Sequence, residues 1–433
     1  MLLSLRKLYA HCTAGMYGLA AAALALTTSG CEDLFGSKDD PTVNEVLEQG
    51  AIDPELVPQD VGYVPIFPAW EGFTQPVDVF VGYDEMVYVV DERGLNVLDQ
   101  TGAFQQLIPL EDAVEVTQNR RLVTYVTARV DTTVQLDRPG TENDTLATFS
   151  VPAVFSIRFT GTPDYEFLDT LVHPFDDGSR YTEARVLDQI DIRDEDVVYH
   201  GIDVNAQDEI YLARSGPTND QTASYAPDNA IFFYSPEGAY IRYADDLSPT
   251  QSSLRSAIGV SGLATFSGPP QRQIGMEETP DFMYCQAARD LPVNYRVLWI
   301  QEVFDADAAQ TTYTPNQDLL AQDTAQGNRF LYEIGRFQEP RDIYIAPDEP
   351  GYIFVVDAGL DSVFVFNQQG IEGVNPPPTA NRSKQVIVSF GGAGSGPFQL
   401  NDPSGVCYHR GFLFIADKNN NRVVRYRLNT ELE

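Results

Sequence analysis

Short runs of β-branched and aromatic residues, broken by glycine, aspartate and asparagine, recur along most of the chain. Three stretches align with one another, at 76–98, 340–366 and 403–426, and each contains three such runs. A weaker copy covers 201–234. Short apolar runs separated by turn residues are typical of β-strands. The pattern therefore predicts an all-β chain built from a repeated unit of short strands.

The three clear copies also share their boundaries. Each begins with a phenylalanine and then a proline that opens the first run, where a strand needs no backbone donor. Each closes its second run with an aspartate, whose carboxylate can accept hydrogen bonds from the N–H groups of the following turn. We therefore expect structural and not catalytic roles for Asp91, Asp357 and Asp417. In the weaker copy, Arg214 replaces this aspartate.

This order of proline, hydrophobic strand, Asp-terminated strand and third strand resembles the NHL repeat of β-propellers, most clearly over 403–428. The resemblance implies four-stranded blades packed around an axis, which suits a chain of 433 residues because a single core rarely grows that large. We predict six blades, with five or seven as alternatives. Where the repeat is faint, strands are still expected at 122–130, 148–159 and 295–301.

The two ends of the repeat region predict how the ring closes. The last copy ends after three strands, whereas the run at 63–68 lies upstream of the first copy, without a unit of its own. Two later copies are preceded by similar runs, at 329–334 and 385–390, which we interpret as outer strands. The N-terminal strand is therefore expected to complete the final blade. The remaining length is assigned to insertions near 137–147, 173–195, 214–229, 246–280 and 305–328.

The first thirty residues are typical of a secretory signal peptide. Arg6 and Lys7 precede an apolar core at 15–26, and small residues lead to Cys31. The Ser-Gly-Cys ending resembles the lipobox of bacterial lipoproteins, although Thr28 stands where leucine is usual. The resemblance implies that Cys31 is acylated and becomes the first residue of the mature chain. An uncleaved signal anchor is the alternative.

The predicted organisation is a signal peptide at 1–30, an acidic flexible tether at 31–60 and a propeller at 61–433. Glu32 and Asp33, directly after the cysteine, resemble sorting signals of some bacterial groups and indicate the outer membrane. No other apolar stretch has the 18 or more residues that a membrane-spanning helix requires. Contact with the membrane is thus expected through the lipid anchor alone.

The charge balance excludes one class of partner. The chain has 63 acidic against 28 basic residues, a formal net charge of −35. Nucleic acids are not expected as partners, because their phosphates require clustered cations. An acidic surface with few lysines resembles proteins of salt-adapted cells, and an acidic binding surface is the other interpretation.

Few residues of the chain suggest a catalytic, cofactor-binding or metal-binding role. His173, His200 and His409 lack the spacing of a metal site, and Cys285 and Cys407 are expected to be separate buried thiols. We therefore assign no catalytic, cofactor-binding or metal-binding residue. Calcium is the one cofactor with oxygen ligands at hand, in Asp417 and the asparagines at 419–421.

Two functions from different classes fit the sequence. The first is a non-catalytic, lipid-anchored scaffold that binds an envelope protein, a glycan or a small ligand. The second is a metal-dependent propeller enzyme, a lyase or lactone hydrolase, which requires Asp, Glu, Asn and His side chains to converge on an axial pocket. A purely structural envelope protein is a third interpretation.

Overall fold

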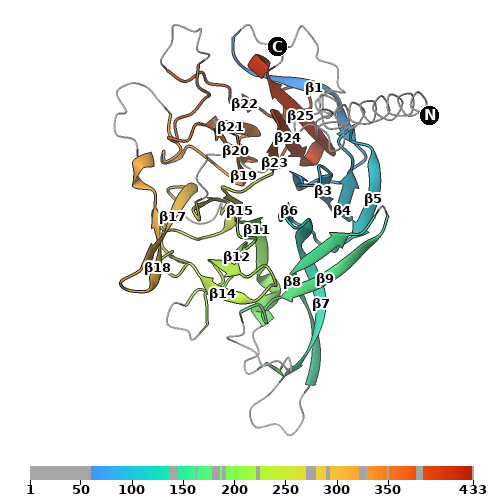
Figure 1. The fold of residues 1–433 in the computed structure, drawn as a ribbon, viewed down its shortest axis with the longest axis vertical. Coiled ribbons are helices and arrows are strands. Elements are labelled where there is room, and N and C mark those ends of the chain that lie inside the picture. Colours follow the sequence, from blue (N-terminus) through green and yellow to red (C-terminus); the bar gives the residue numbers. More distant parts are fainter. Residues whose placement is uncertain are drawn as a thin grey trace, which may run out of the picture. The chain divides into compact units, whose positions relative to one another are not determined.

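The described part of the chain folds into six β-sheets around one axis (Figure 1). The computed structural model describes residues 60–136, 145–161, 163–177, 186–187, 192–220, 225–269, 279–288, 293–320, 329–348, 351–376 and 384–431. The predicted signal peptide at 1–30 and the predicted tether, with Cys31, up to residue 59 lie outside these residues. Among the described residues, no helix has the length and apolar character needed to cross a bilayer.

Each sheet is one blade, and its strands follow the chain outward from the axis. The first blade contains β2 (Asp78–Val81), β3 (Val87–Asp91), β4 (Gly94–Leu98) and β5 (Phe104–Pro109). The second contains β6 (Glu115–Gln118), β7 (Val123–Leu136), β8 (Thr145–Phe159), β9 (Tyr165–Val172) and β10 (Val186–Leu187). The third contains β11 (Val198–Val204), β12 (Ile210–Ser215), β13 (Ala230–Tyr234) and β14 (Tyr240–Tyr243).

The second half of the chain repeats this arrangement. The fourth blade contains β15 (Val260–Thr265), β16 (Phe282–Gln286), β17 (Val297–Asp305) and β18 (Gln310–Pro315). The fifth contains β19 (Pro340–Ile345), β20 (Ile353–Asp357), β21 (Ser362–Phe366) and β22 (Phe390–Gly391). The sixth contains β23 (Pro403–His409), β24 (Phe412–Asp417) and β25 (Arg422–Leu428), with β1 (Tyr63–Glu71) outermost. Short 3-10 turns cover Ile192–Asp196, Gln317–Leu319, Lys418–Asn420 and Asn429–Glu431.

The predicted ring closure is confirmed. β1 pairs antiparallel with β25, from Tyr63 opposite Leu428 to Glu71 opposite Arg422, so the first strand completes the last blade (Figure 1). The all-β fold with six blades is also confirmed. The second blade departs from the four-strand pattern, because β10 pairs in parallel with the far end of β7, at Gln135 and Leu136.

Of two predicted outer strands, one is wrong and the other is confirmed only at its last residue. The run at 329–334 forms no strand, and only Phe330 makes an isolated bridge, to Ile371. The outer strand of the fourth blade is instead β18, inside the predicted insertion at 305–328. β18 was missed because much of it faces solvent, which leaves its sequence polar. Of the run at 385–390, only Phe390 enters β22, while Val386 bridges Val374.

The second blade carries the largest extension in the described residues. The expected strands at 122–130 and 148–159 are present, but β7 and β8 are longer and stay paired as far as Leu136 opposite Thr145. In Figure 1 this hairpin extends beyond the rest of the ring. Of the insertion predicted near 137–147, residues 145–147 belong to β8, and residues 137–144 lie outside the described residues.

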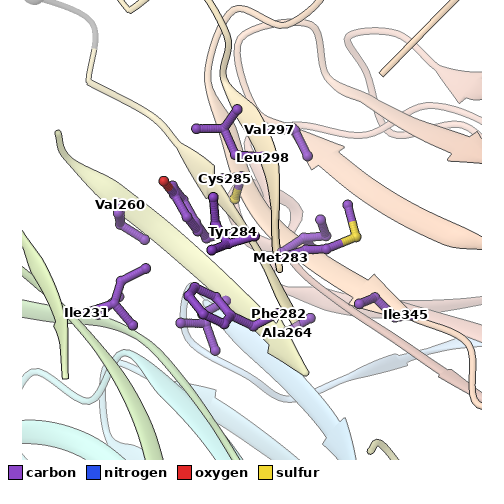
Figure 2. Packing of buried hydrophobic residues seen from close by; sticks show 14 of the residues in the cluster. Ile231, Val260, Ala264, Phe282, Met283, Tyr284, Cys285, Val297, Leu298 and Ile345 are labelled. Carbon is purple, nitrogen blue, oxygen red and sulfur yellow. The ribbon is translucent and has the colours of Figure 1, made fainter. Parts of the chain in front are cut away.

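Blades pack on each other through apolar faces. A cluster of buried side chains from the third, fourth and fifth blades includes Ile231, Phe282, Met283 and Ile345 (Figure 2). Cys285 lies in this cluster, whereas Cys407 is buried in β23 of the sixth blade, and both are free thiols. The prediction of two separate buried thiols is thus confirmed.

The repeated aspartates hold each blade to the loop that enters it. Asp357 accepts hydrogen bonds from the N–H groups of Gly359 and Leu360, as predicted for the following turn. It also accepts from Gln338 and Glu339, just before β19. Asp91 and Asp417 accept in the same way from Thr74 and Asn401. The structural interpretation of these residues is confirmed, with an additional loop contact that the sequence did not predict.

We predict that Gly405→Ala destabilises the ring. An added Cβ at Gly405 would lie 2.6 Å from the Cα atom of Asp78 and 3.0 Å from the Val77 carbonyl oxygen, across the junction of the sixth and first blades. Because backbone atoms cannot move aside cheaply, we expect a loss of about 2–3 kcal/mol in urea unfolding. Gly396→Ala is the matched control, since its Cβ would meet only the side chain of Gln399. Equal losses in both variants would contradict the close approach.

Candidate functional site

Corresponding residues of the six innermost strands line a cavity of about 160 Å³ at one end of the axis. In the last four blades the inner strand has a bulge after its first or second residue, which turns one side chain toward the axis. The first two blades place a valine at the same point, just before β2 and β6. The six lining residues are Val77, Val114, His200, Ser261, Arg341 and Ser404.

Three carboxyl groups form the next layer of the cavity. Asp78, Glu115 and Asp342 each occupy the position that follows the bulge in the repeat, whereas the other three blades have glycine there. Gly262 and Gly405 leave the space that the carboxyl groups of Asp342 and Asp78 fill, because a Cβ at either glycine would come within 3.0 Å of them. At these two junctions, the carboxyl group of one blade therefore packs against a glycine of the preceding blade.

These carboxyl groups join adjacent blades. Asp78 accepts a hydrogen bond from the N–H of Val116 in the second blade at 2.8 Å. Asp342 accepts from Val406 in the sixth blade at 2.7 Å. Each also accepts from the N–H of the residue that follows it. Both oxygens of both carboxyl groups are thus engaged by backbone donors.

The remaining junctions use the same kind of bond. Glu115 accepts from Ile202 between the second and third blades. Asp203 accepts from Thr265 at 2.7 Å between the third and fourth. Ser261 and Ser404 donate to the carbonyl groups of prolines in the next blade, at 2.7 and 3.1 Å. Every junction around the ring therefore has a side-chain bond from one inner strand to the backbone of the next.

Burial and mutual repulsion change the titration of this layer. Burial, opposed by the backbone donors and increased by the charge of Asp203, raises the pKa of Asp78 to about 7. Burial and the neighbouring acids also raise the pKa of Glu115 and of Asp342 well above their ordinary values. Protonated carboxyl groups can donate as well as accept hydrogen bonds.

The rim of the cavity carries cationic and neutral donors. Arg341 forms an ion pair with Glu339, and Lys418 lies 3.8 Å from Asp402. Burial and the charge of Arg341 lower the pKa of His200 to about 4, so its ring is neutral at pH 7. The cavity thus combines charged donors at its rim, a neutral imidazole and carboxyl groups deeper along the axis.

The other end of the axis is crossed by a loop of the fourth blade. The hydroxyl of Tyr83, in the first blade, donates to the carbonyl of Ser267. The hydroxyl of Tyr344 donates to the carbonyl of Pro269 at 3.3 Å, and a Cβ on Gly268 would touch it. Since the first and fourth blades lie on opposite sides of a six-bladed ring, this loop spans the axis, and the cavity opens at the Arg341 end.

The histidines singled out in the sequence do not converge. His200 lines the cavity, but His409 is buried elsewhere on β23 and His173 lies in a separate cluster with Asp176 and Asp194. Sequence reasoning missed the axial acids. A signal was present, because Asp78 and Asp342 follow their prolines at the same spacing in two aligned copies, where Gly405 stands in the third.

The turn proposed for calcium is used for structure. Asp417 accepts from the N–H of Asn401 at 2.8 Å and from the guanidinium of Arg422 at 2.7 Å, while the Asn420 amide also donates to it. Among the described residues, no group of three or more His, Cys, Asp or Glu side chains is arranged to hold a metal ion. The axial carboxyl groups of Asp78 and Asp342 accept the backbone hydrogen bonds that join adjacent blades.

We predict that Asp78→Asn changes the pH dependence of stability. A carboxyl group with a raised pKa in the folded state stabilises the fold at low pH, and this contribution is lost as the pH rises toward 7. The stability of wild type relative to Asp78→Asn should therefore fall by about 2 kcal/mol between pH 5 and 8. Urea unfolding at both pH values measures this difference.

Comparing wild type with Asp78→Asn cancels an opposing effect of two histidines on the pH dependence of stability. The lowered pKa values of His200 and His409, about 4 and about 3, reduce stability as the pH falls, and they act equally in both chains. Glu166→Gln, at an exposed carboxyl group on β9, serves as the control. Parallel curves for wild type and Asp78→Asn would contradict the raised pKa.

Comparison with known proteins identifies one repeat and a set of distant structures. The profile of the NHL repeat family matches residues 400–426. No curated protein sequence matches the chain. Similar solved structures include an auxiliary nutrient binding protein from Bacteroides thetaiotaomicron VPI-5482, with 13% identity over 88% of this chain and 75% of that one and a TM-score of 0.47.

Two further structures are enzymes. One is a gluconolactonase from Xanthomonas campestris, with 11% identity over 86% of this chain and 90% of that one and a TM-score of 0.44. The other is the PQQ-bound aldose sugar dehydrogenase from Streptomyces coelicolor, with 10% identity over 86% and 99% of the two chains and a TM-score of 0.46. From its own sheets and repeat, the chain is a six-bladed β-propeller with an NHL repeat in its last blade.

Proposed function

We propose that this protein is an exported, lipid-anchored propeller that binds a small polyhydroxylated ligand, without catalysis, in its axial cavity. The observation that carries the proposal is the cavity with one open end, lined by equivalent residues of all six blades. A rigid ring positions these side chains, and a closed far end gives the ligand a floor.

The size and lining of the cavity favour one sugar ring. A cavity of about 150 Å³ holds a ring the size of benzene, and this one measures about 160 Å³. Val77 and Val114 form an apolar wall suited to the C–H face of such a ring, whereas Arg341 and the axial carboxyl groups offer donors and acceptors for its hydroxyl groups.

The same geometry disfavours the metal-dependent enzyme. Carboxyl groups do converge on the axis, as that function requires, but Asp78 and Asp342 use both of their oxygens to accept backbone hydrogen bonds. A metal at the axis would have to share these oxygens with the backbone donors that join the blades, and among the described residues no group of three or more His, Cys, Asp or Glu side chains is arranged to hold one. Binding of a sugar, in contrast, requires no change in the hydrogen bonds of Asp78 and Asp342.

The proposed location follows from the N-terminal sequence. Acylation of Cys31 would anchor the propeller outside the cytoplasm, Glu32 and Asp33 favour the outer membrane, and the lipid would be its only membrane contact. A flexible tether of residues 31–60 would have a reach of roughly 30 Å. Envelope glycans and proteins would then be the partners within reach.

We predict that the full-length protein binds a monosaccharide or sugar acid saturably in isothermal titration calorimetry. Arg341→Gln removes a charged donor from the rim and leaves a shorter, neutral polar side chain, and the loss should weaken binding by about tenfold. Arg255→Gln is the control, because Arg255 is an exposed arginine outside the cavity. Absence of saturable binding across a panel of neutral, acidic and amino sugars would contradict the proposal, as would equal binding by both variants.

We predict that Cys31 carries the lipid. Cells supplied with labelled palmitate should incorporate the label into the wild-type protein but not into Cys31→Ser, and the variant should leave the membrane fraction. Cys12→Ser, a second cysteine of the N-terminal segment, is the matched control and should retain the label. Label in Cys31→Ser, or a wild-type chain without label, would contradict lipid anchoring while leaving the cavity proposal untouched.

A further inference from the structure

The outer strand of the second blade has an exposed edge. Each outermost strand of a propeller pairs on one side only, so its other backbone edge is available for pairing. Within the described residues, β9 pairs with β8 alone. β9 is eight residues long, and its first five residues, Tyr165–Asp169, are all exposed. Among the described outer strands, β1, β5 and β18 bury residues at several positions instead.

Aromatic side chains lie along one face of this edge. Tyr165 and Phe167 are 37% and 49% exposed, and their ring centroids are 5.6 Å apart in an edge-to-face arrangement. Phe155 on β8 supports Phe167 from below, with centroids 5.7 Å apart. Exposed aromatic side chains that are already held in place can anchor a partner with little loss of side-chain entropy.

The opposite face of the same edge opens into a groove. A bulge at Leu168, between the pairs Ile157–Phe167 and Ser156–Asp169, turns this leucine toward the third blade. Leu168 and Asp169 line a cavity of about 230 Å³ together with Arg158 of β8 and the turn at 236–238 between β13 and β14. The strand edge thus has an anchor on one face and a pocket on the other.

We propose that the outer edge of β9 binds an extended, basic segment of another protein by strand addition. In this mode backbone hydrogen bonds supply affinity, and alternate side chains of the added strand face opposite sides of the sheet. One set would pack on Tyr165 and Phe167, and the other would reach the groove beside Leu168. This is a second surface, separate from the axial cavity, and it goes beyond the small-ligand function proposed above.

The negative charge of the β9 edge indicates which kind of partner strand it binds. The stretch 164–170 contains three carboxylates, Asp164, Glu166 and Asp169, and no basic residue. Two copies of a chain with a net charge of −35 repel each other, which disfavours pairing of β9 with itself. The chain's own segment 32–59 has eight acidic residues and one lysine, so it is repelled as well. A basic partner strand is the occupant that this edge attracts.

The test uses the full-length protein and three blocked eight-residue peptides. The first alternates lysine with valine and threonine, the second replaces lysine with glutamate, and the third keeps the lysines but replaces valine with proline. Proline cannot donate to a β-ladder, so the third peptide measures charge attraction alone. Binding is measured by fluorescence anisotropy, and amide hydrogen exchange reports which strand is covered.

We expect only the first peptide to bind saturably and to slow exchange at the amides of β9. Phe167→Ser should weaken this binding by about tenfold, whereas Ile241→Ser, at an exposed residue of β14, should not change it. The double variant Glu166→Lys with Asp169→Lys should reverse the preference, so that the glutamate peptide binds. Thermal melting of each variant checks that the fold is retained.

Three outcomes would overturn the proposal. Equal binding of the proline peptide would reduce the contact to charge attraction. Protection at strands other than β9 would place the site elsewhere. Concentration-dependent dimers that Phe167→Ser abolishes would make a second copy the occupant. None of these outcomes bears on sugar binding in the axial cavity, so the two proposals fail separately.

Discussion

The ring depends on how the innermost strands satisfy their backbone. Each of these strands faces the axis with one edge that no other strand covers, and a buried N–H without a partner is costly. Side chains of the preceding blade supply the partner: Asp78 to the second blade, Asp203 to the fourth and Asp342 to the sixth. Carboxyl groups suit this task because one group can accept from two N–H donors at once. The blades are therefore joined by polar bonds at the axis as well as by apolar packing farther out.

This way of joining blades also determines the character of the cavity. Acids that hold the junctions lie together in a buried layer, where burial first and their mutual repulsion second raise the pKa values of Asp78 and Asp342. Because their carboxyl groups also join adjacent blades, these residues cannot be exchanged without weakening the ring. Selectivity can vary more freely one position earlier, where the side chains of Val77, Val114 and His200 line the cavity. The residues that join the blades and the residues that line the cavity are thus neighbours in the sequence at the start of each inner strand.

The features that recur along the sequence were predicted correctly, whereas the solvent-facing strand β18 and the axial acids, which come from different blades, were missed. Hydrophobic alternation and the Pro-to-Asp spacing predicted the propeller, the role of Asp357 and the closure by residues 63–68, because these features are local or recur in register. β18 was missed because an outer strand that faces solvent carries little hydrophobic signal. The axial site was missed for another reason: its acids come from different blades, and only the ring brings Glu115 near Asp342. The aligned Asp78 and Asp342 were visible, but only the folded ring shows that both line the axial cavity.

The third blade shows that an insertion in a repeat can serve the fold. By its pairing with β11, Arg214 occupies the position of Asp357 and Asp417 in the other blades. A buried guanidinium cannot accept hydrogen bonds from the incoming loop, so the charge must be met by other groups. Asp176, from the insertion near 173–195, lies 3.0 Å from it, and the carbonyl groups at 226 and 227 accept hydrogen bonds from its Nη2. Two stretches that the sequence marked as polar insertions therefore replace one repeated aspartate. Among the described residues, the longest paired extension is the β7–β8 hairpin of the second blade, which β9 borders.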